Sequence, residues 1–434
     1  MSSAQDMPDA SARLAADWLL TNISRLVTLE NANGGAANPL GIIERGALAA
    51  RDGRIVWVGS EQALAAAVAV EAVAPAARVD AGGRAVSPGF VDAHTHFIFA
   101  GDRAEEFHLR HAGVGYEELA RQGRGILSTV RATRAASADE LCALGEARLR
   151  SFAAQGTTTV EGKSGYGLDL ATEGRILEVM AALAREGDAR GLPRIVPTLL
   201  GAHTLPPEGR GSPEARAAYV DAVCDEMLPA FAGRARFCDV FCESSAFTVA
   251  ESRRVLERAR ALGYALKLHA NQLGPSGGAR LAAELGAVSA DHLDYASDDE
   301  VDALRDAGVT GVLLPGCSFT LSAPYPAARR LLDRGMTVAL ATDFNPGTSY
   351  SESMQMMIAL AVSAMGMSLE QALRAATLGG ASALALADEV GSLAPGKRCD
   401  LVILRGADER ELAYHFGVNL VAETYIGARR AAAR

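Results

Sequence analysis

Residues 91–107 read VDAHTHFIFAGDRAEEF, and the fold prediction starts from this stretch. An apolar run ends in His94 and His96, two residues apart, and a polar segment follows. This pattern is typical of a buried β-strand that ends at a polar loop. Residues i and i+2 of a strand point to the same side, so the two imidazoles can face one common point. The stretch therefore predicts a strand end that carries chemistry.

Seven further apolar segments end in a similar way downstream. Stretches rich in Ala, Leu, Glu and Arg, such as 137–155 and 249–263, lie between them and are typical of helices. Eight alternating strand–helix units in roughly 300 residues predict an α/β fold of the (β/α)₈ TIM-barrel type. The eight predicted strands lie within 87–96, 156–165, 194–203, 237–244, 264–272, 286–294, 308–316 and 336–343.

Both ends of the chain are predicted to form short strands with tight turns. The segments 18–29, 46–59 and 78–90 carry DG and GG turn signals, and 391–404 and 422–430 have a similar pattern. We predict three parts: 1–84 and 386–434 together form a small β-sandwich domain, and 85–385 forms the metal-dependent barrel. Chain termini often lie close together, which favours one small domain built from both ends.

The composition narrows the class of protein. The chain has 434 residues, is 49% hydrophobic and carries a net charge of −10, with no run of Lys and Arg. Nucleic acid and anionic membranes are therefore not expected as partners. The six cysteines are scattered, which indicates free thiols in a reducing cytoplasm. We expect no secretory signal and no membrane span, because no basic-then-apolar leader or sufficiently long apolar run occurs.

Polar side chains gather at the predicted strand ends, where a barrel carries its chemistry. Besides His94 and His96, they are Lys163, His203, Glu243, His269, Asp291, His292 and Asp343. Alone, an HxH pair also fits packed or surface histidines. His269 and Asp343 follow strands five and eight, which a closed barrel brings to the same mouth. Three imidazoles and one carboxylate predict a site for one divalent metal, Zn²⁺ or Fe²⁺.

Longer motifs resemble the amidohydrolase superfamily and, within it, the imidazolonepropionases of histidine degradation. The motifs are DAHTHFIFAGDRAEEF, STVRATRAAS, GTTTVEGKSGYGLD, LLGAHTLPPE, YVDAVCDEMLP, DVFCES, HANQLGPSGG, ADHLD, ALATDFNPGTS, GSLAPGKRCDLVIL and AYHFGVN. Many superfamily members carry a metal-bridging lysine on strand four, and DVFCES has none, which favours a single metal. The resemblance suggests a homodimer and implies that Lys163 lies near the substrate.

The resemblance implies metal-dependent hydrolysis of the cyclic amide C–N bond of 4-imidazolone-5-propanoate to N-formimidoyl-L-glutamate. Asp343, beside the metal, would move the water proton, and His292 would polarise the ring carbonyl, unless His292 is only a supporting or core residue. Arg103 would pair with the propanoate, unless it pairs with Glu105 or Glu106. The other substrate contacts implied are Tyr166, His203, Gln272, Asn345, Gly347 and Thr348, of which 345–348 also fit an ordinary turn.

Three departures from the family pattern leave an alternative open. Gly162, Ser245 and Cys317 stand where bulkier or different residues are usual, and they could widen the mouth of the barrel. The same fold could then act on a related ring, such as the 2-thioxo analogue, with water displacing sulfur. A barrel kept only for binding or assembly is the remaining alternative, and the presence of every predicted ligand argues against it.

Overall fold

The computed structural model describes residues 13–30, 37–114 and 124–433. Its central sheet has eight parallel strands in the order in which they occur along the chain. A bridge between Thr95 and Phe344 joins the first strand end to the last and closes the barrel. The predicted (β/α)₈ fold is therefore confirmed. The strands are β5 (Phe90–Asp92), β6 (Thr157–Lys163), β7 (Arg194–Ala202), β8 (Phe237–Cys242), β9 (Ala265–Ala270), β10 (Ser289–His292), β11 (Thr310–Leu313) and β12 (Val338–Leu340).

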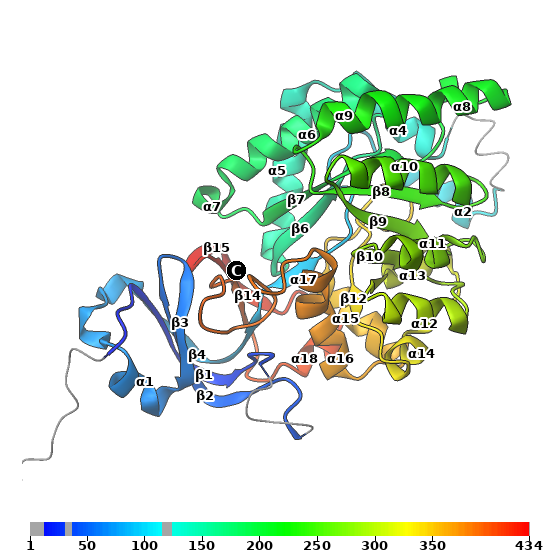
Figure 1. The fold of residues 1–434 in the computed structure, drawn as a ribbon. Helices are drawn as coiled ribbons and strands as arrows, with labels where there is room; N and C mark the ends of the chain where they lie inside the picture. The colour runs from blue at the N-terminus through cyan, green and yellow to red at the C-terminus, as the bar shows by residue number, and fades with distance from the viewer. Residues whose placement is uncertain (1–12, 31–36, 115–123, 434) are drawn as a thin grey trace, which may run out of the picture.

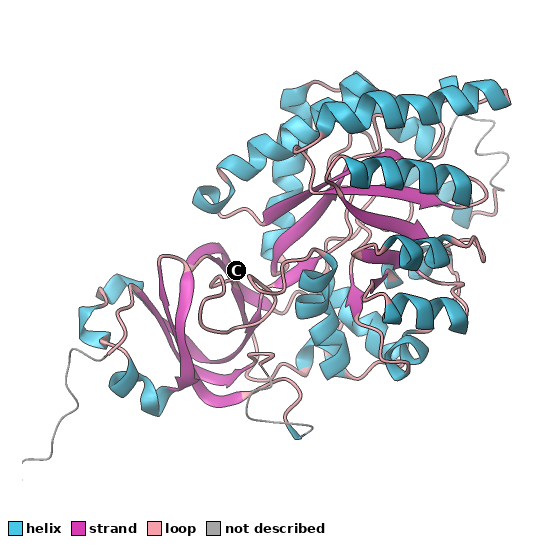
Figure 2. Ribbon diagram, in the orientation of Figure 1, coloured by secondary structure: helices cyan, strands magenta, loops and turns pink. Residues whose placement is uncertain are grey.

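Helices surround the barrel strands (Figure 2). Several begin at a capping side chain, as Ser137 does for α5 and Thr248 for α10, where the hydroxyl accepts a backbone N–H of the first turn. They are α2 (Ala104–His111), α4 (Ile126–Ala135), α5 (Ala138–Ala154), α6 (Leu170–Arg185), α7 (Gly187–Arg190), α8 (Pro213–Ala222), α9 (Leu228–Phe231), α10 (Val249–Ala261), α11 (Gly278–Leu285), α12 (Asp298–Asp306), α13 (Pro315–Leu321), α14 (Ala328–Asp333), α15 (Met354–Ser363), α16 (Leu369–Arg374) and α17 (Gly380–Ala383). Among the described residues, none of the helices has both the length and the apolar character needed to cross a membrane.

The second sheet combines the two ends of the chain, as predicted. Figure 1 shows its blue amino-terminal strands beside the red carboxy-terminal ones, next to the barrel. The strand order is β15-β14-β13-β4-β1-β2-β3. Its elements are β1 (Trp18–Leu26), β2 (Ile43–Arg51), β3 (Arg54–Ser60), β4 (Arg78–Pro88), β13 (Leu401–Leu404), β14 (Val421–Ile426) and β15 (Arg429–Ala433), with α1 (Glu61–Ala67) beside them and α18 (Glu411–Tyr414) before β14. The domain bounds at 84 and 386 stay predictions, and β4 runs on to Pro88 before the barrel begins.

The barrel interior changes from apolar to charged along its axis. Val91, Val196, Phe237 and Val312 belong to one buried apolar cluster with residues of α17. The ammonium group of Lys267 lies 5.5 Å from the Phe237 ring and begins a layer of buried charges. This layer supports the strand ends where the predicted site lies.

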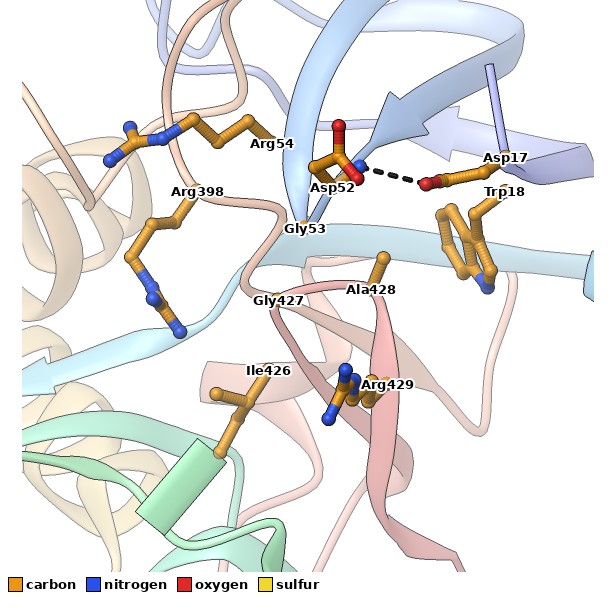
Figure 3. Close-up of a pocket in the computed structure, with 10 residues that line it drawn as sticks. All are labelled: Asp17, Trp18, Asp52, Gly53, Arg54, Arg398, Ile426, Gly427, Ala428 and Arg429. Carbon is orange, nitrogen blue, oxygen red and sulfur yellow. Dashed lines mark hydrogen bonds between the residues drawn. The ribbon is translucent and has the colours of Figure 1, made fainter. Parts of the chain in front are cut away.

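A cavity of about 400 Å³ lies in the small domain, away from the barrel mouth. Figure 3 shows Arg54, Arg398 and Arg429 around it, together with Asp17 and Asp52. The backbone N–H of Asp52 donates to the carboxylate of Asp17 at 2.8 Å. The charges of both signs are exposed or half-buried, and none of the residues predicted for chemistry lies here.

Candidate active site

The four predicted metal ligands lie together at the carboxyl end of the barrel. Ligand atoms of His94, His96 and His269 all lie within 4.8 Å of one another. Oδ1 of Asp343 lies 3.5 Å from Nε2 of His94 and 3.9 Å from Nε2 of His96. All four side chains are buried. Three neutral imidazoles and one carboxylate are a donor set that a divalent transition metal accepts.

The protonation of His94 fits a metal ligand. Its Nδ1 lies 2.6 Å from Oδ2 of Asp291, so Nδ1 carries the proton and donates it. Its Nε2 is buried and has no hydrogen-bond partner among the described residues, and a cation would satisfy it. Burial holds the pKa of His94 well below its usual range, which keeps the ring neutral.

Asp343 also fits a cation site. Burial raises the pKa of its carboxyl to about 8. A nearby divalent ion favours the charged form of a carboxylate and would reverse that shift. The backbone just before Asp343 is held by β5, because Thr342 donates from N (3.0 Å) and Oγ1 (2.6 Å) to the buried carboxylate of Asp92.

The backbone is strained where the predicted catalytic residues stand. His292 has φ 76° and Asp343 has φ 52°, both in the left-handed region that non-glycine residues rarely adopt. Such strain persists where the surrounding structure fixes a residue for function. His292 lies close to the metal ligands, with its ring centroid 5.7 Å from that of His94 and 5.5 Å from that of His269. Burial lowers the pKa of His292 to about 3, so its imidazole is neutral.

A cavity of about 620 Å³ opens above these residues. Of the predicted substrate contacts, all except Gly347 line it. Its lining includes His96, Arg103, Glu106, Arg110, Arg124, Tyr166, His203, Thr204, Arg210, Phe241, Ser245, His269, Gln272, His292, Asp343, Asn345 and Thr348. Predicted metal ligands and several arginines thus line the same cavity.

Arg103 lies in the cavity wall and is paired with Glu106. Its Nε donates to Oε2 of Glu106 at 3.0 Å, and its Nη2 pairs with Oε1. Burial works against the charged form of Glu106, but Arg103 and the N–H of Gly125 outweigh it and lower the pKa of the carboxyl. The guanidinium packs on Gly347, where a Cβ would overlap Nη1 and lie 2.8 Å from Cζ. Both features hold the guanidinium in place, and Nε and Nη2 are engaged by Glu106.

Aromatic rings form another wall of the cavity. His203 stacks on His96 with 4.9 Å between ring centroids and a 13° interplanar angle, and its Nδ1 lies 3.0 Å from the carbonyl oxygen of Gly165. Tyr166 packs edge-on against His203. Burial lowers the pKa of His203 to about 4 and raises that of Tyr166, so both side chains are neutral hydrogen-bonding groups.

Residues 345–348 form a hydrogen-bonded turn at the rim. Oδ1 of Asn345 accepts from N of Gly347 and N of Thr348, both at 2.8 Å, and its Nδ2 donates to the carbonyl of Asp343 at 2.6 Å. The Asn345 amide therefore braces the backbone beside Asp343. The side-chain amide of Gln272, in contrast, has a weak partner, with Nε2 3.6 Å from Sγ of Cys317.

Two expectations from the sequence are wrong. Lys163 does not line the cavity; it is fully buried beneath the site, with Nζ 2.6 Å from Asp239. Gly162 does not widen the mouth, because a Cβ there would lie 2.7 Å from Phe97 and 2.9 Å from Met180, between the barrel and α6. Side chains alternate along β6, so Gly162 faces outward while its neighbours face the barrel axis.

The sequence interpretation missed the charged layer under the metal ligands. Glu161, Lys163, Asp239, Lys267 and Asp291 are all fully buried and form ion pairs with one another. A signal was present, because charges in otherwise apolar strands are rarely buried unless they are paired. It also missed Arg110 and Arg210 in the cavity wall.

Comparison with known proteins agrees with this architecture. Residues 85–426 match the model of the Amidohydrolase family. The chain is 51% identical to an imidazolonepropionase of Symbiobacterium thermophilum over 94% of this chain and 95% of the relative, and 48% identical to one of Syntrophobacter fumaroxidans over 88% and 89%.

Among solved structures, an adenosine deaminase from Xanthomonas campestris with bound Zn superposes with a TM-score of 0.69 at 21% identity, covering 96% of this chain and 93% of that one. Escherichia coli guanine deaminase gives 0.66 at 16% identity, covering 96% and 100%. These structures share the fold. The chain therefore belongs to the amidohydrolase family of hydrolytic enzymes and, within it, to the imidazolonepropionase group.

Proposed function

We propose that the chain hydrolyses 4-imidazolone-5-propanoate to N-formimidoyl-L-glutamate, a step of histidine degradation. The oxygen of water bonds to the ring carbonyl carbon, the adjacent ring C–N bond breaks, and the ring nitrogen takes up a proton. One observation carries the proposal: a buried set of three histidines and Asp343 opens into a cavity whose wall holds Arg103. The names of the relatives support the same substrate.

His94, His96, His269 and Asp343 would hold one divalent ion. Such an ion supplies Lewis-acid chemistry, which makes water a nucleophile at neutral pH and polarises a carbonyl. Zn²⁺ and Fe²⁺ both accept these ligands, and the zinc in a neighbour of the same fold makes Zn²⁺ the first ion to test.

Asp343 is the proposed proton carrier. Its carboxylate lies beside the ligand histidines and lines the cavity, where it can accept a proton from water and donate it to the leaving ring nitrogen. Gln272 lines the same cavity, but an amide cannot act as a base. The Asn345 amide holds the backbone carbonyl of Asp343 in place and so supports the segment that carries this carboxylate.

His292 is the proposed electrophilic group. Its neutral imidazole can donate one N–H to the ring carbonyl oxygen, where negative charge develops during attack. Its Nδ1 lies 3.8 Å from Oδ2 of Asp294, too far for a hydrogen bond. His292 can therefore donate to the substrate without first breaking a hydrogen bond to Asp294.

Arg103 is the proposed partner of the propanoate. A guanidinium is always charged and is suited to carboxylates, and Glu106 orients this one at the cavity wall. Tyr166, His203 and Thr348 line the same cavity as Arg103 and would contact the ring or its product. Gly347 would contribute through its packing on Arg103, with no side chain of its own.

The 2-thioxo ring analogue, the alternative substrate, has less support than the sequence suggested. Gly162 faces α6 and Cys317 is buried behind Gln272, so of the three departures only Ser245 lines the cavity. A wider mouth would have to come from Ser245 alone.

Steady-state ultraviolet spectroscopy with freshly prepared imidazolone propanoate tests the proposal, with the 2-thioxo analogue in parallel. We expect turnover of the first ring by the metal-loaded protein, formation of N-formimidoyl-L-glutamate, and a loss of activity in Asp343→Asn. Sulfide release from the analogue without turnover of imidazolone propanoate would overturn the proposal.

The homodimer that the resemblance suggests remains a prediction. Light scattering tests it, and a dimer would have twice the mass of one chain.

A further inference from the structure

A buried lysine connects two of the ligand histidines from below. Nζ of Lys163 lies 2.6 Å from Oδ2 of Asp239 and 3.3 Å from Oδ2 of Asp291. Each of these two oxygens also contacts Nδ1 of a ligand histidine: Asp239 that of His269 at 3.0 Å, and Asp291 that of His94 at 2.6 Å. One ammonium group thus links two aspartate–histidine pairs.

Each aspartate is fixed by more than the lysine. Oδ1 of Asp239 accepts the backbone N–H of His269 at 3.2 Å, and Oδ1 of Asp291 accepts from Ser289 at 2.6 Å. In both cases the remaining oxygen, Oδ2, faces the histidine ring and Lys163. Each carboxylate can then hold its histidine ring only if a positive charge balances the negative charge on its Oδ2.

We propose that Lys163 is a positioning residue for the metal site: its ammonium group orients Asp239 and Asp291, which hold the rings of His269 and His94. A carboxylate behind a ligand histidine fixes the ring and raises its basicity toward the metal. Without the lysine, two buried carboxylates would repel each other and turn away from the rings. The proposal rests on the metal ligands and does not depend on which ring is the substrate.

The same ammonium lies beside a second group of possible metal ligands. His94, Glu161 and Asp291 form another group of possible metal ligands. Nζ of Lys163 lies 3.0 Å from Glu161 and 3.3 Å from Asp291, so this group already faces a positive charge. The wild-type chain should therefore bind a single ion.

Lys267 provides a matched control. It is as fully buried as Lys163 and also pairs with Glu161, at 2.8 Å, but it lies 4.0 Å from Asp291 and donates to the carbonyl of Ala93. Lys267→Met removes the same charge from the same layer without removing the link between the two aspartates.

The experiment measures the Zn²⁺ affinity of the full chain by competition with a chromophoric chelator, and the visible absorption spectrum of the Co²⁺-loaded protein. Lys163→Met should weaken Zn²⁺ binding by about 10- to 100-fold and change the Co²⁺ spectrum, while Lys267→Met should stay within about threefold of wild type. Equal losses in both variants, or an unchanged Lys163→Met, would overturn the proposal.

Asp239→Asn keeps the shape of the side chain and gives a second test if Lys163→Met does not fold. It should weaken Zn²⁺ binding and alter the Co²⁺ spectrum in the same direction, and wild-type values would contradict the proposal. If the wild-type chain binds no Zn²⁺, the ligand assignment itself is wrong. If it binds Zn²⁺ but does not turn over imidazolone propanoate, only the proposed substrate is wrong.

Discussion

Nε of Arg103 donates to Oε2 of Glu106 at 3.0 Å, and the same oxygen accepts the backbone N–H of Gly125 at 2.7 Å. One carboxylate therefore fixes the guanidinium and joins it to the segment before α4. This ion pair orients the residue proposed to bind the substrate carboxylate.

Glu106→Gln should raise KM for imidazolone propanoate about tenfold with little change in kcat, because charge-assisted hydrogen bonds contribute about 1.5–3 kcal/mol and a neutral amide forms weaker ones. Steady-state kinetics checks this. Glu105→Gln is the control, since Glu105 is largely exposed and pairs with Arg124. An unchanged KM in Glu106→Gln would show that Arg103 needs no orienting partner.

Gly347→Ala should displace the Arg103 guanidinium, because the added Cβ would overlap Nη1. The clash involves the flexible end of a side chain, so we expect a small change in Tm and a rise in KM. Gly274→Ala is the matched control, because a Cβ there meets no atom within 4 Å. Kinetics with thermal melting distinguishes the two effects, and a normal KM with a large drop in Tm would contradict the interpretation.

His292→Asn should lower kcat by about 10²–10³-fold, the usual cost of losing one hydrogen bond to a developing oxyanion, with metal content unchanged. Because burial lowers the pKa of His292 to about 3, the ring is neutral from pH 5 to 9 under this account. The variant should therefore keep the shape of the wild-type pH–rate profile in that range. A lost titration step would contradict the assignment.

Arg216 holds the loop that follows β8. It pairs with Glu251 at 2.6 Å and donates to the carbonyl of Ala246, which lines the cavity. The hydrogen bond from Arg216 is the largest influence on the pKa of Glu251 and lowers it. Burial opposes this effect and Thr248 adds to it, so the pKa falls from its ordinary 4.5 to about 2. The stabilisation is present above pH 4.5 and is lost as the pH falls toward 2.

Glu251→Gln should accordingly lower the free energy of unfolding at pH 7 by about 1 kcal/mol, a value reduced for solvent screening, and by less near pH 3. Urea denaturation at the two pH values measures the difference. An equal loss at both pH values would assign the effect to packing or to the helix cap.

The fold could be predicted because each barrel strand is a short apolar segment that ends in a polar residue. Part of the predicted metal site followed from geometry, since the two-residue spacing of His94 and His96 places both side chains on the same side of a strand end. Gly162 was placed on the wrong side, although the alternation with Glu161 and Lys163 in β6 indicates its direction.

Contacts between distant residues could not be predicted in the same way. Lys163 and Asp239 are 76 positions apart, and only the closed barrel brings them within 2.6 Å. For Arg103 the sequence left three partners open, namely the substrate carboxylate, Glu105 and Glu106. The brace from Asn345 to Asp343 depends on the detailed shape of one turn.

The central claim is that His94, His96, His269 and Asp343 bind one divalent ion. The most direct test is anomalous X-ray diffraction at the zinc edge from crystals of the Zn²⁺-loaded protein. The account predicts one strong anomalous peak per chain, within about 2.0–2.2 Å of three imidazole nitrogens and one carboxylate oxygen. A peak elsewhere, or no peak between these four side chains, would contradict it.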